Sequence, residues 1–254
     1  MAKLAELIDC LTAVLGIPRT TLEAYVKPLR KAGLLSSAGR SGPGAPDMTA
    51  TDAVNLLLAV LGGSALRATE NVENYRNLVF FAPPGLKGGR LDGALTYLAL
   101  EKDHTFGEVL EGLIRADNNR PAEGMLRDWV ALEAAGAAGR PFDLSTGGGT
   151  HLRQAIDERY ATYTRVQITE PRLAAAIEIG AIDRATRVIE LRLIADYAPR
   201  RVVDNPACDW EKDGLDAGDL TVQRIVGSAT LDALAQMLGG EPRGFGRALR
   251  RQRR

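Results

Sequence analysis

The sequence predicts an α+β fold that is mostly helical, with an antiparallel β-meander and flanking helices toward the C-terminus. Over the first 140 residues, apolar side chains recur every three or four positions, as in amphipathic helices. Residues 165–168, 174–179 and 188–194 instead alternate or run apolar between turn residues, a pattern typical of short strands. With 254 residues, 45% of them hydrophobic and 25% charged, the chain is long enough to bury its own core.

The first helix is predicted over residues 4–15, because its apolar side chains fall on one face. These side chains are Leu4, Leu7, Ile8, Leu11, Val14 and Leu15. Gly16 ends the helix, and a short connection leads to a second helix whose start is predicted from a capping box of Thr20 and Glu23. This arrangement is a helix, a tight turn and a helix.

The second helix is predicted to bury one side and to expose cations on the other. The buried side consists of Leu22, Tyr25, Val26 and Leu29. This spacing leaves Lys27, Arg30 and Lys31 on or beside the solvent face, while Pro28 is expected to kink or shorten the helix and Gly33 to stop it.

A loop of small residues follows over positions 36–46, with Arg40 near its tip, and predicts a wing. Thr49 and Asp52 then predict the capped start of a third, strongly apolar helix.

These segments resemble winged helix-turn-helix proteins, in particular regulators of the phage and prophage type. The resemblance covers the first quarter of the chain and rests on LRKAGLL (residues 29–35), the loop GRSGPGAP (39–46) and MTATDAVNLLLA (48–59). It implies that the second helix enters the major groove of duplex DNA and that the wing touches the backbone or minor groove. The implied contacts come from Arg19, Thr20, Thr21, Lys27, Arg30, Lys31 and Arg40.

Charge is distributed unevenly along a chain whose formal net charge is +0. Both ends are basic and the middle is acidic, which suits a protein that touches phosphate with its extremities. The C-terminal tail contributes three further candidate DNA contacts, Arg247, Arg250 and Arg251.

Four regions are expected along the chain. Residues 1–62 form the DNA-binding module, 63–140 a helical region packed on it, 141–240 an α+β domain for dimerisation or partner contact, and 241–254 a disordered basic tail. Further helices are predicted over residues 66–80, 91–100, 106–117, 121–135, 150–163 and 220–238.

No pattern of residues indicates an enzyme, a cofactor or a metal site. The glycines at 147–149 lack the ending of a P-loop, and the acidic residues between Asp204 and Asp219 do not match a calcium loop. His104 and His151 are expected at the surface, and Cys10 and Cys208 as buried, reduced thiols. No apolar run has the length of a membrane span and no signal peptide is evident, so a cytoplasmic location is expected.

The sequence therefore favours a sequence-specific protein that binds double-stranded DNA, most simply a transcriptional regulator acting as a homodimer or higher oligomer. Two alternatives remain open. One is a phage DNA-packaging or replication initiator that uses the same module, and the other is a non-catalytic protein-interaction scaffold.

Overall fold

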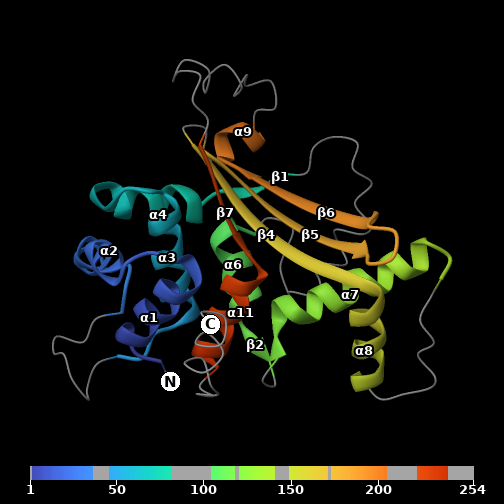
Figure 1. Cartoon of the computed structure of the whole chain (residues 1–254). Coiled ribbons are helices and arrows are strands. Elements are labelled where there is room, and N and C mark those ends of the chain that lie inside the picture. Colours follow the sequence, from blue (N-terminus) through green and yellow to red (C-terminus); the bar gives the residue numbers. More distant parts are fainter. Residues whose placement is uncertain are drawn as a thin grey trace.

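The computed structural model describes residues 2–36, 46–81, 104–117, 120–140, 149–170, 173–204 and 222–239. Within them the protein has the predicted α+β fold, and its main sheet is antiparallel and five-stranded. Helices α1 to α4 lie on one side of the molecule, the sheet with α7 and α8 on the other, and α6 and α11 between them (Figure 1).

The three N-terminal helices end where the sequence predicts, and the first and third also begin at the predicted residues. Helix α1 spans Leu4–Leu15 and closes at Gly16, whose φ of 68° is left-handed. Helix α2 spans Arg19–Lys31, and α3 spans Ala50–Leu61. Thr49 Oγ1 accepts from the Asp52 amide at 3.2 Å and the Asp52 carboxylate accepts from the Thr49 amide at 2.8 Å, so this predicted capping box is confirmed.

The capping box predicted at Thr20 and Glu23 is wrong. The residue preceding α2 is Pro18, whose carbonyl accepts the amides of Thr21 and Leu22 at 3.0 and 3.2 Å. Thr20 consequently lies inside the first turn, and Glu23 bonds to the Arg19 side chain instead. Proline fits this place because its φ is already fixed near −60°.

The helices predicted over residues 66–80 and 106–117 are shorter than expected, whereas the one predicted over 121–135 is not. A 3-10 turn η1 (Ala65–Arg67) leads into α4 (Ala68–Arg76), and Val79–Phe81 form strand β1 rather than the end of a helix. Helix α6 spans Phe106–Ile114, and the ribbon of β2 (Ala116–Asp117) and β3 (Arg120–Pro121) follows it. Helix α7 spans Ala122–Ala137, and the helix predicted over 91–100 lies outside the described residues.

Strands β4 to β6 form the predicted meander. Strand β4 (Tyr160–Glu170) pairs with β5 (Ala174–Asp183), which pairs with β6 (Ile189–Ala198), each antiparallel to the next. The strands are longer than predicted, and β1 extends the sheet beside β6 while β7 (Val222–Gly227) extends it beside β4. A short helix α9 (Arg200–Asp204) follows β6.

Two segments predicted as continuous helices are each split between a helix and a strand. Helix α8 (Gly149–Arg159) ends before Tyr160, and α11 (Ser228–Leu238) begins only after β7. Both corrections have one cause. The β-branched and aromatic residues at these positions gain backbone hydrogen bonds across β4, β5 and β7, which outweigh a helical pattern of apolar residues.

One continuous apolar core joins the N-terminal helices to the sheet. The inner face of the sheet packs on α7, while α11 contacts α1, α6 and α7. Tyr75 of α4 donates to the Thr169 carbonyl at 3.3 Å, and so links α4 to the end of β4. Helices α4 and α6 therefore pack on the N-terminal helices, whereas α7 packs on the sheet, and the region boundaries at 62, 140 and 240 stay predictions.

The described residues before Val79 form helices and contain no strand. The loop that should form the wing falls mainly on residues 37–45, which lie outside the described residues, so the wing stays a prediction. In the described part of the chain, no helix is long and apolar enough to span a membrane.

Candidate nucleic-acid interface

The exposed face of α2 is set by the four side chains that the helix buries. Leu22 and Leu29 are fully buried, and Tyr25 and Val26 nearly so. All four were predicted, because their spacing of three and four residues places them on one side. The six predicted contact residues of α2 accordingly all lie exposed at the surface: Arg19, Thr20, Thr21, Lys27, Arg30 and Lys31.

The cations of α2 differ in their partners. Arg19 Nε donates to Glu23 at 2.9 Å, and Arg19 also pairs with Asp9 of α1. The hydrogen bond to Glu23, together with the charge of Asp9, raises the pKa of Arg19. Lys27, Arg30 and Lys31, in contrast, form no ion pair with any carboxylate in the described part of the chain. The uncompensated charge of α2 therefore lies in its C-terminal half.

The C-terminal half of α2 stays helical despite Pro28. The Ala32 amide donates to the Pro28 carbonyl at 3.0 Å, and the chain then closes through the Gly33 and Leu34 amides, which donate to Arg30 and Leu29 at 3.1 and 2.9 Å. Gly33 takes a φ of 73°, as this type of helix end requires. Pro28 only removes one backbone hydrogen-bond donor, and the expected shortening of the helix does not occur. The positive charges of Arg30 and Lys31 also interact favourably with the negative end of the helix dipole.

The segment that leaves α2 is fixed to α3 by polar contacts. The Leu34 carbonyl accepts from Asn55 at 2.8 Å, and the Ser36 amide donates to the Asp52 carboxylate at 2.6 Å. Asn55 in turn accepts from Arg76 at 2.9 Å, and Arg76 pairs with Glu111 of α6. The position of α2 is thus tied through α3 and α4 to the middle of the molecule.

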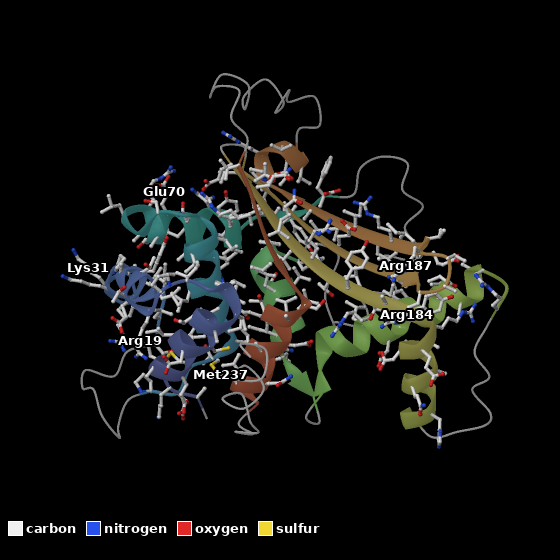
Figure 2. All side chains as sticks on the ribbon, in the orientation of Figure 1. Arg19, Lys31, Glu70, Arg184, Arg187 and Met237 are labelled. Atoms are coloured by element: carbon white, nitrogen blue, oxygen red, sulfur yellow. The ribbon has the colours of Figure 1, made fainter. Side chains whose placement is uncertain are left out.

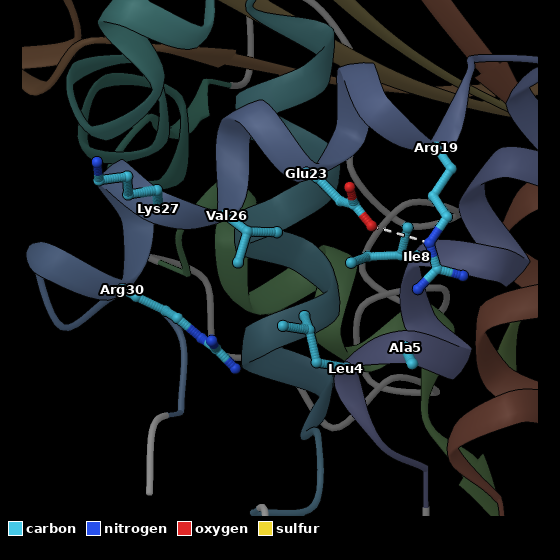
Figure 3. A pocket seen from close by; sticks show the side chains of 8 residues that line it. All are labelled: Leu4, Ala5, Ile8, Arg19, Glu23, Val26, Lys27 and Arg30. Atoms are coloured by element: carbon cyan, nitrogen blue, oxygen red, sulfur yellow. Dashed lines mark hydrogen bonds and ion pairs between the residues drawn. The ribbon is translucent and has the colours of Figure 1, made fainter. Parts of the chain in front are cut away.

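A cleft of about 430 Å³ lies between α1 and α2 (Figure 3). Its apolar lining comes from Leu4, Ala5 and Ile8 of α1 and from Val26 of α2. Its charged lining consists of Arg19, Glu23, Lys27 and Arg30. Arg30 points toward Leu4, whereas the Arg19–Glu23 pair lies at the opposite end of the cleft (Figure 3). The sequence placed Leu4 and Ile8 in the core but gave no indication of this cleft, since it depends on how the two helices pack.

Comparisons with known protein families, curated proteins and solved structures were made for the whole chain. No match was found.

Four predicted contact residues lie outside the described residues. They are Arg40 of the loop and Arg247, Arg250 and Arg251 of the tail. Cys208, every acidic residue between Asp204 and Asp219, and Gly147 and Gly148 lie outside as well.

His104 was expected at the surface, but it is buried. It is only 4% exposed, and its Nε2 lies 2.8 Å from the Tyr197 hydroxyl. Its ring stacks on Phe80, with 5.4 Å between ring centroids. The Phe80 amide also donates to the His104 carbonyl at 3.3 Å. The pairing of β1 with β6 brings these residues together, so no local sequence pattern indicates that His104 is buried. His151, in contrast, is exposed as expected.

Cys10 is buried as expected, and burial raises the pKa of its thiol to about 11. A thiol so protonated is a poor nucleophile and a poor metal ligand. Among the described residues, no group of three or more His, Cys, Asp or Glu is arranged to hold a metal ion.

A charged cluster on the outer face of the sheet was also missed. Glu178 of β5 is 9% exposed, and it accepts from Tyr163 at 2.5 Å and from Arg192 at 2.9 Å. Arg165, its direct partner on β4, lies 3.7 Å away. A lone acid in an apolar strand, with arginines in two neighbouring strands, is the sequence signal that indicates such a cluster.

Proposed function

We propose that this protein binds double-stranded DNA through α2 and acts as a sequence-specific regulator, with two or more copies on each site. The observation that carries the proposal is the row of exposed cations at Lys27, Arg30 and Lys31, which no described carboxylate compensates. Such cations can contact DNA phosphates, releasing the counterions bound there, and can also reach base edges.

The buried side of α2 supports the same proposal. Four apolar anchors and the contacts of Leu34 and Ser36 hold the helix rigidly, so its exposed side chains project from a fixed frame. A recognition helix needs this rigidity, because a contact with a base edge depends on a defined side-chain position.

Thr20 and Thr21 lie in the first turn of α2 and are the proposed contacts at the start of the helix, where helix-turn-helix proteins meet base edges. Arg19 is a weaker candidate than its neighbours, since Asp9 and Glu23 already compensate its charge and accept from two of its nitrogens. Arg40 and the tail residues Arg247, Arg250 and Arg251 are proposed to add phosphate contacts, which raise affinity without reading sequence.

The regulatory role rests on the resemblance of the first quarter of the chain to phage-type regulators. A dimer is proposed because one short helix makes too few base contacts for high specificity. Sedimentation of the protein with and without its selected DNA site tests the number of copies.

The test of DNA binding begins with selection of bound fragments from a random duplex pool. Affinity for the preferred fragment is then measured for the parent and for the triple variant Lys27→Ala, Arg30→Ala, Lys31→Ala. A bidentate base contact is worth about 1–3 kcal/mol, so the variant is expected to bind at least about fivefold more weakly.

The matched control removes three cations elsewhere, by Arg187→Ala, Arg200→Ala and Arg201→Ala. These residues are exposed and lie away from α2; Lys31 and Arg187 mark opposite ends of the molecule (Figure 2). The control should retain the parent affinity. The proposal is overturned if the α2 variant is folded and binds the preferred fragment as tightly as the control.

A further inference from the structure

We infer that the cleft between α1 and α2 binds a small organic anion with an apolar body, and that a bound anion opposes the binding of DNA. The second half of this inference rests on the proposed function, whereas the first half stands without it.

The size and lining of the cleft point to a small molecule. Ligand sites commonly enclose about 300–1,000 Å³ and combine an apolar surface with a few polar groups, and this cleft has a volume of about 430 Å³. Ile8 and Val26 are nearly buried, so the little surface they expose in the cleft is apolar, and Leu4 and Ala5 extend it along α1.

The charge of the lining specifies an anion. Three cations and one carboxylate line the cleft, and the carboxylate of Glu23 already accepts from Arg19 at 2.9 Å. Lys27 and Arg30 form no ion pair with a described carboxylate, so the uncompensated charge at this end is positive. A guanidinium offers paired donors that suit either a carboxylate or a phosphate.

The positions of these groups define the pose. Arg30 points toward Leu4 across the cleft (Figure 3). An anionic head at Arg30 therefore leaves the apolar body over Leu4, Ala5 and Val26, whereas the Lys27 amine points away from Arg30 and adds positive charge at the rim (Figure 3). The Arg19–Glu23 pair limits the far end.

The anion and DNA compete because both would contact Arg30. Lys27 and Arg30 line the cleft and also belong to the row of cations proposed to contact DNA. Lys31 belongs only to that row, since it does not line the cleft, and Ala5 belongs only to the cleft. These two residues allow the two activities to be separated.

Binding is measured by isothermal titration and by amide chemical shifts with octanoate and, in a separate arm, octyl phosphate. Saturable binding of either probe, with shifts centred on residues of α1 and α2, is the expected result. Propanoate, which lacks the apolar body, and octylammonium, which reverses the charge, should bind at least tenfold more weakly. Equal binding of octylammonium, or no saturable binding of either anion, overturns the inference.

Two variants localise the site. Ala5→Trp fills the cleft from an exposed position and should abolish probe binding, while Lys31→Ala should leave it unchanged. Retained probe binding in a folded Ala5→Trp protein overturns the location. Arg30→Ala is expected to weaken probe binding about tenfold, through loss of a charged hydrogen bond.

Competition is then measured with the selected DNA fragment. Saturating octanoate or octyl phosphate should weaken DNA binding by the parent at least fivefold and by Ala5→Trp hardly at all. DNA affinity that is unchanged when the probe is bound overturns the regulatory half. A protein that binds the probe but no DNA contradicts the proposed function alone, and one that binds DNA but no probe contradicts this inference alone.

Discussion

At the scale of single residues, α2 separates side chains that stabilise the protein from side chains that face its partners. Leu22 and Leu29 are fully buried, whereas Lys27, Arg30 and Lys31 are exposed. Substitutions on the two sides should therefore have different consequences.

We predict that Leu22→Ala or Leu29→Ala lowers the free energy of unfolding by about 2–5 kcal/mol, because each leaves a cavity in the core. The triple alanine variant of Lys27, Arg30 and Lys31 should change it by less than about 1.5 kcal/mol, since each exposed substitution usually changes it by no more than about 0.5 kcal/mol. Urea denaturation measures both. Equal losses in the two groups of variants would mean that α2 is not packed as described.

A second prediction concerns Arg187 in the turn between β5 and β6. Its φ of 61° is left-handed, and it is the one non-glycine residue with positive φ in the part of the chain that the structure describes. The left-handed conformation destabilises the folded state by roughly 1–2 kcal/mol when the residue has a side chain. Introducing a glycine offsets part of that gain, because the greater entropy of the unfolded chain destabilises the folded state by about 0.4–1 kcal/mol. Arg187→Gly should therefore stabilise the protein by up to about 1 kcal/mol.

The control is Ala185→Gly, two residues earlier in the same turn, where φ is not positive. It gains nothing from a flexible backbone and should destabilise the protein. Thermal melting of both variants decides the matter, and a lower melting temperature for Arg187→Gly than for the parent would contradict the prediction.

At the scale of secondary-structure elements, the sheet is stabilised by contacts between strands as well as by its apolar inner face. Glu178 of β5 links β4 and β6 through Tyr163, Arg165 and Arg192. Burial acts to raise the pKa of Glu178, but the hydrogen bonds from Tyr163 and Arg192 and the charges of Arg192 and Arg165 together lower it below its usual 4.5. Burial and Glu178 in turn raise the pKa of Tyr163 to about 12.

A lowered carboxyl pKa makes stability depend on pH in one direction. The stabilisation from ionised Glu178 is complete above about pH 4.5, the ordinary pKa of the group, and is lost as the pH falls through the lower pKa of the folded state. We predict that Glu178→Gln is less stable than the parent at pH 7 and that the difference shrinks below pH 4.5.

Urea denaturation from pH 7 to pH 3 measures this difference. Glu158→Gln is a suitable control, because Glu158 is an exposed glutamate of α8 whose carboxylate accepts a hydrogen bond from Gln154. A difference between parent and Glu178→Gln that stays constant down to pH 3 would show that the carboxylate does not stabilise the sheet through its charge.

At the scale of the whole molecule, a net charge of +0 hides a cationic α2 and a basic tail. DNA binding by such a protein should depend strongly on salt, because each phosphate contact releases a counterion. The number of contacts determines the slope of affinity against salt concentration.

We predict that the logarithm of the DNA association constant falls linearly with the logarithm of salt concentration. Each phosphate contact contributes about 0.9 to the slope, so the triple alanine variant of α2 should lower it by up to about 2.7. The triple variant at Arg187, Arg200 and Arg201 should keep the parent slope. An affinity that stays constant over the salt range would contradict the proposed mode of binding.

What the sequence by itself determined are the features set by local spacing. The spacing of Leu22, Tyr25, Val26 and Leu29 predicted which side of α2 is buried, and Gly16 and Gly33 predicted where two helices end. The alternation of β4 to β6 predicted the meander. These succeed because a helix or hairpin relates residues close in sequence, so its period appears directly in the chain.

Only the tertiary structure decided the features that depend on distant residues. Tyr160 and Val222 lie in strands because β4 pairs with β5 and β7, and His104 is buried because β1 pairs with β6. Arg19 is neutralised because packing of α1 against α2 brings Asp9 to it, and the same packing forms the cleft. A hydrogen bond or ion pair between distant segments leaves no periodic trace in the sequence, yet its free energy can override a local preference.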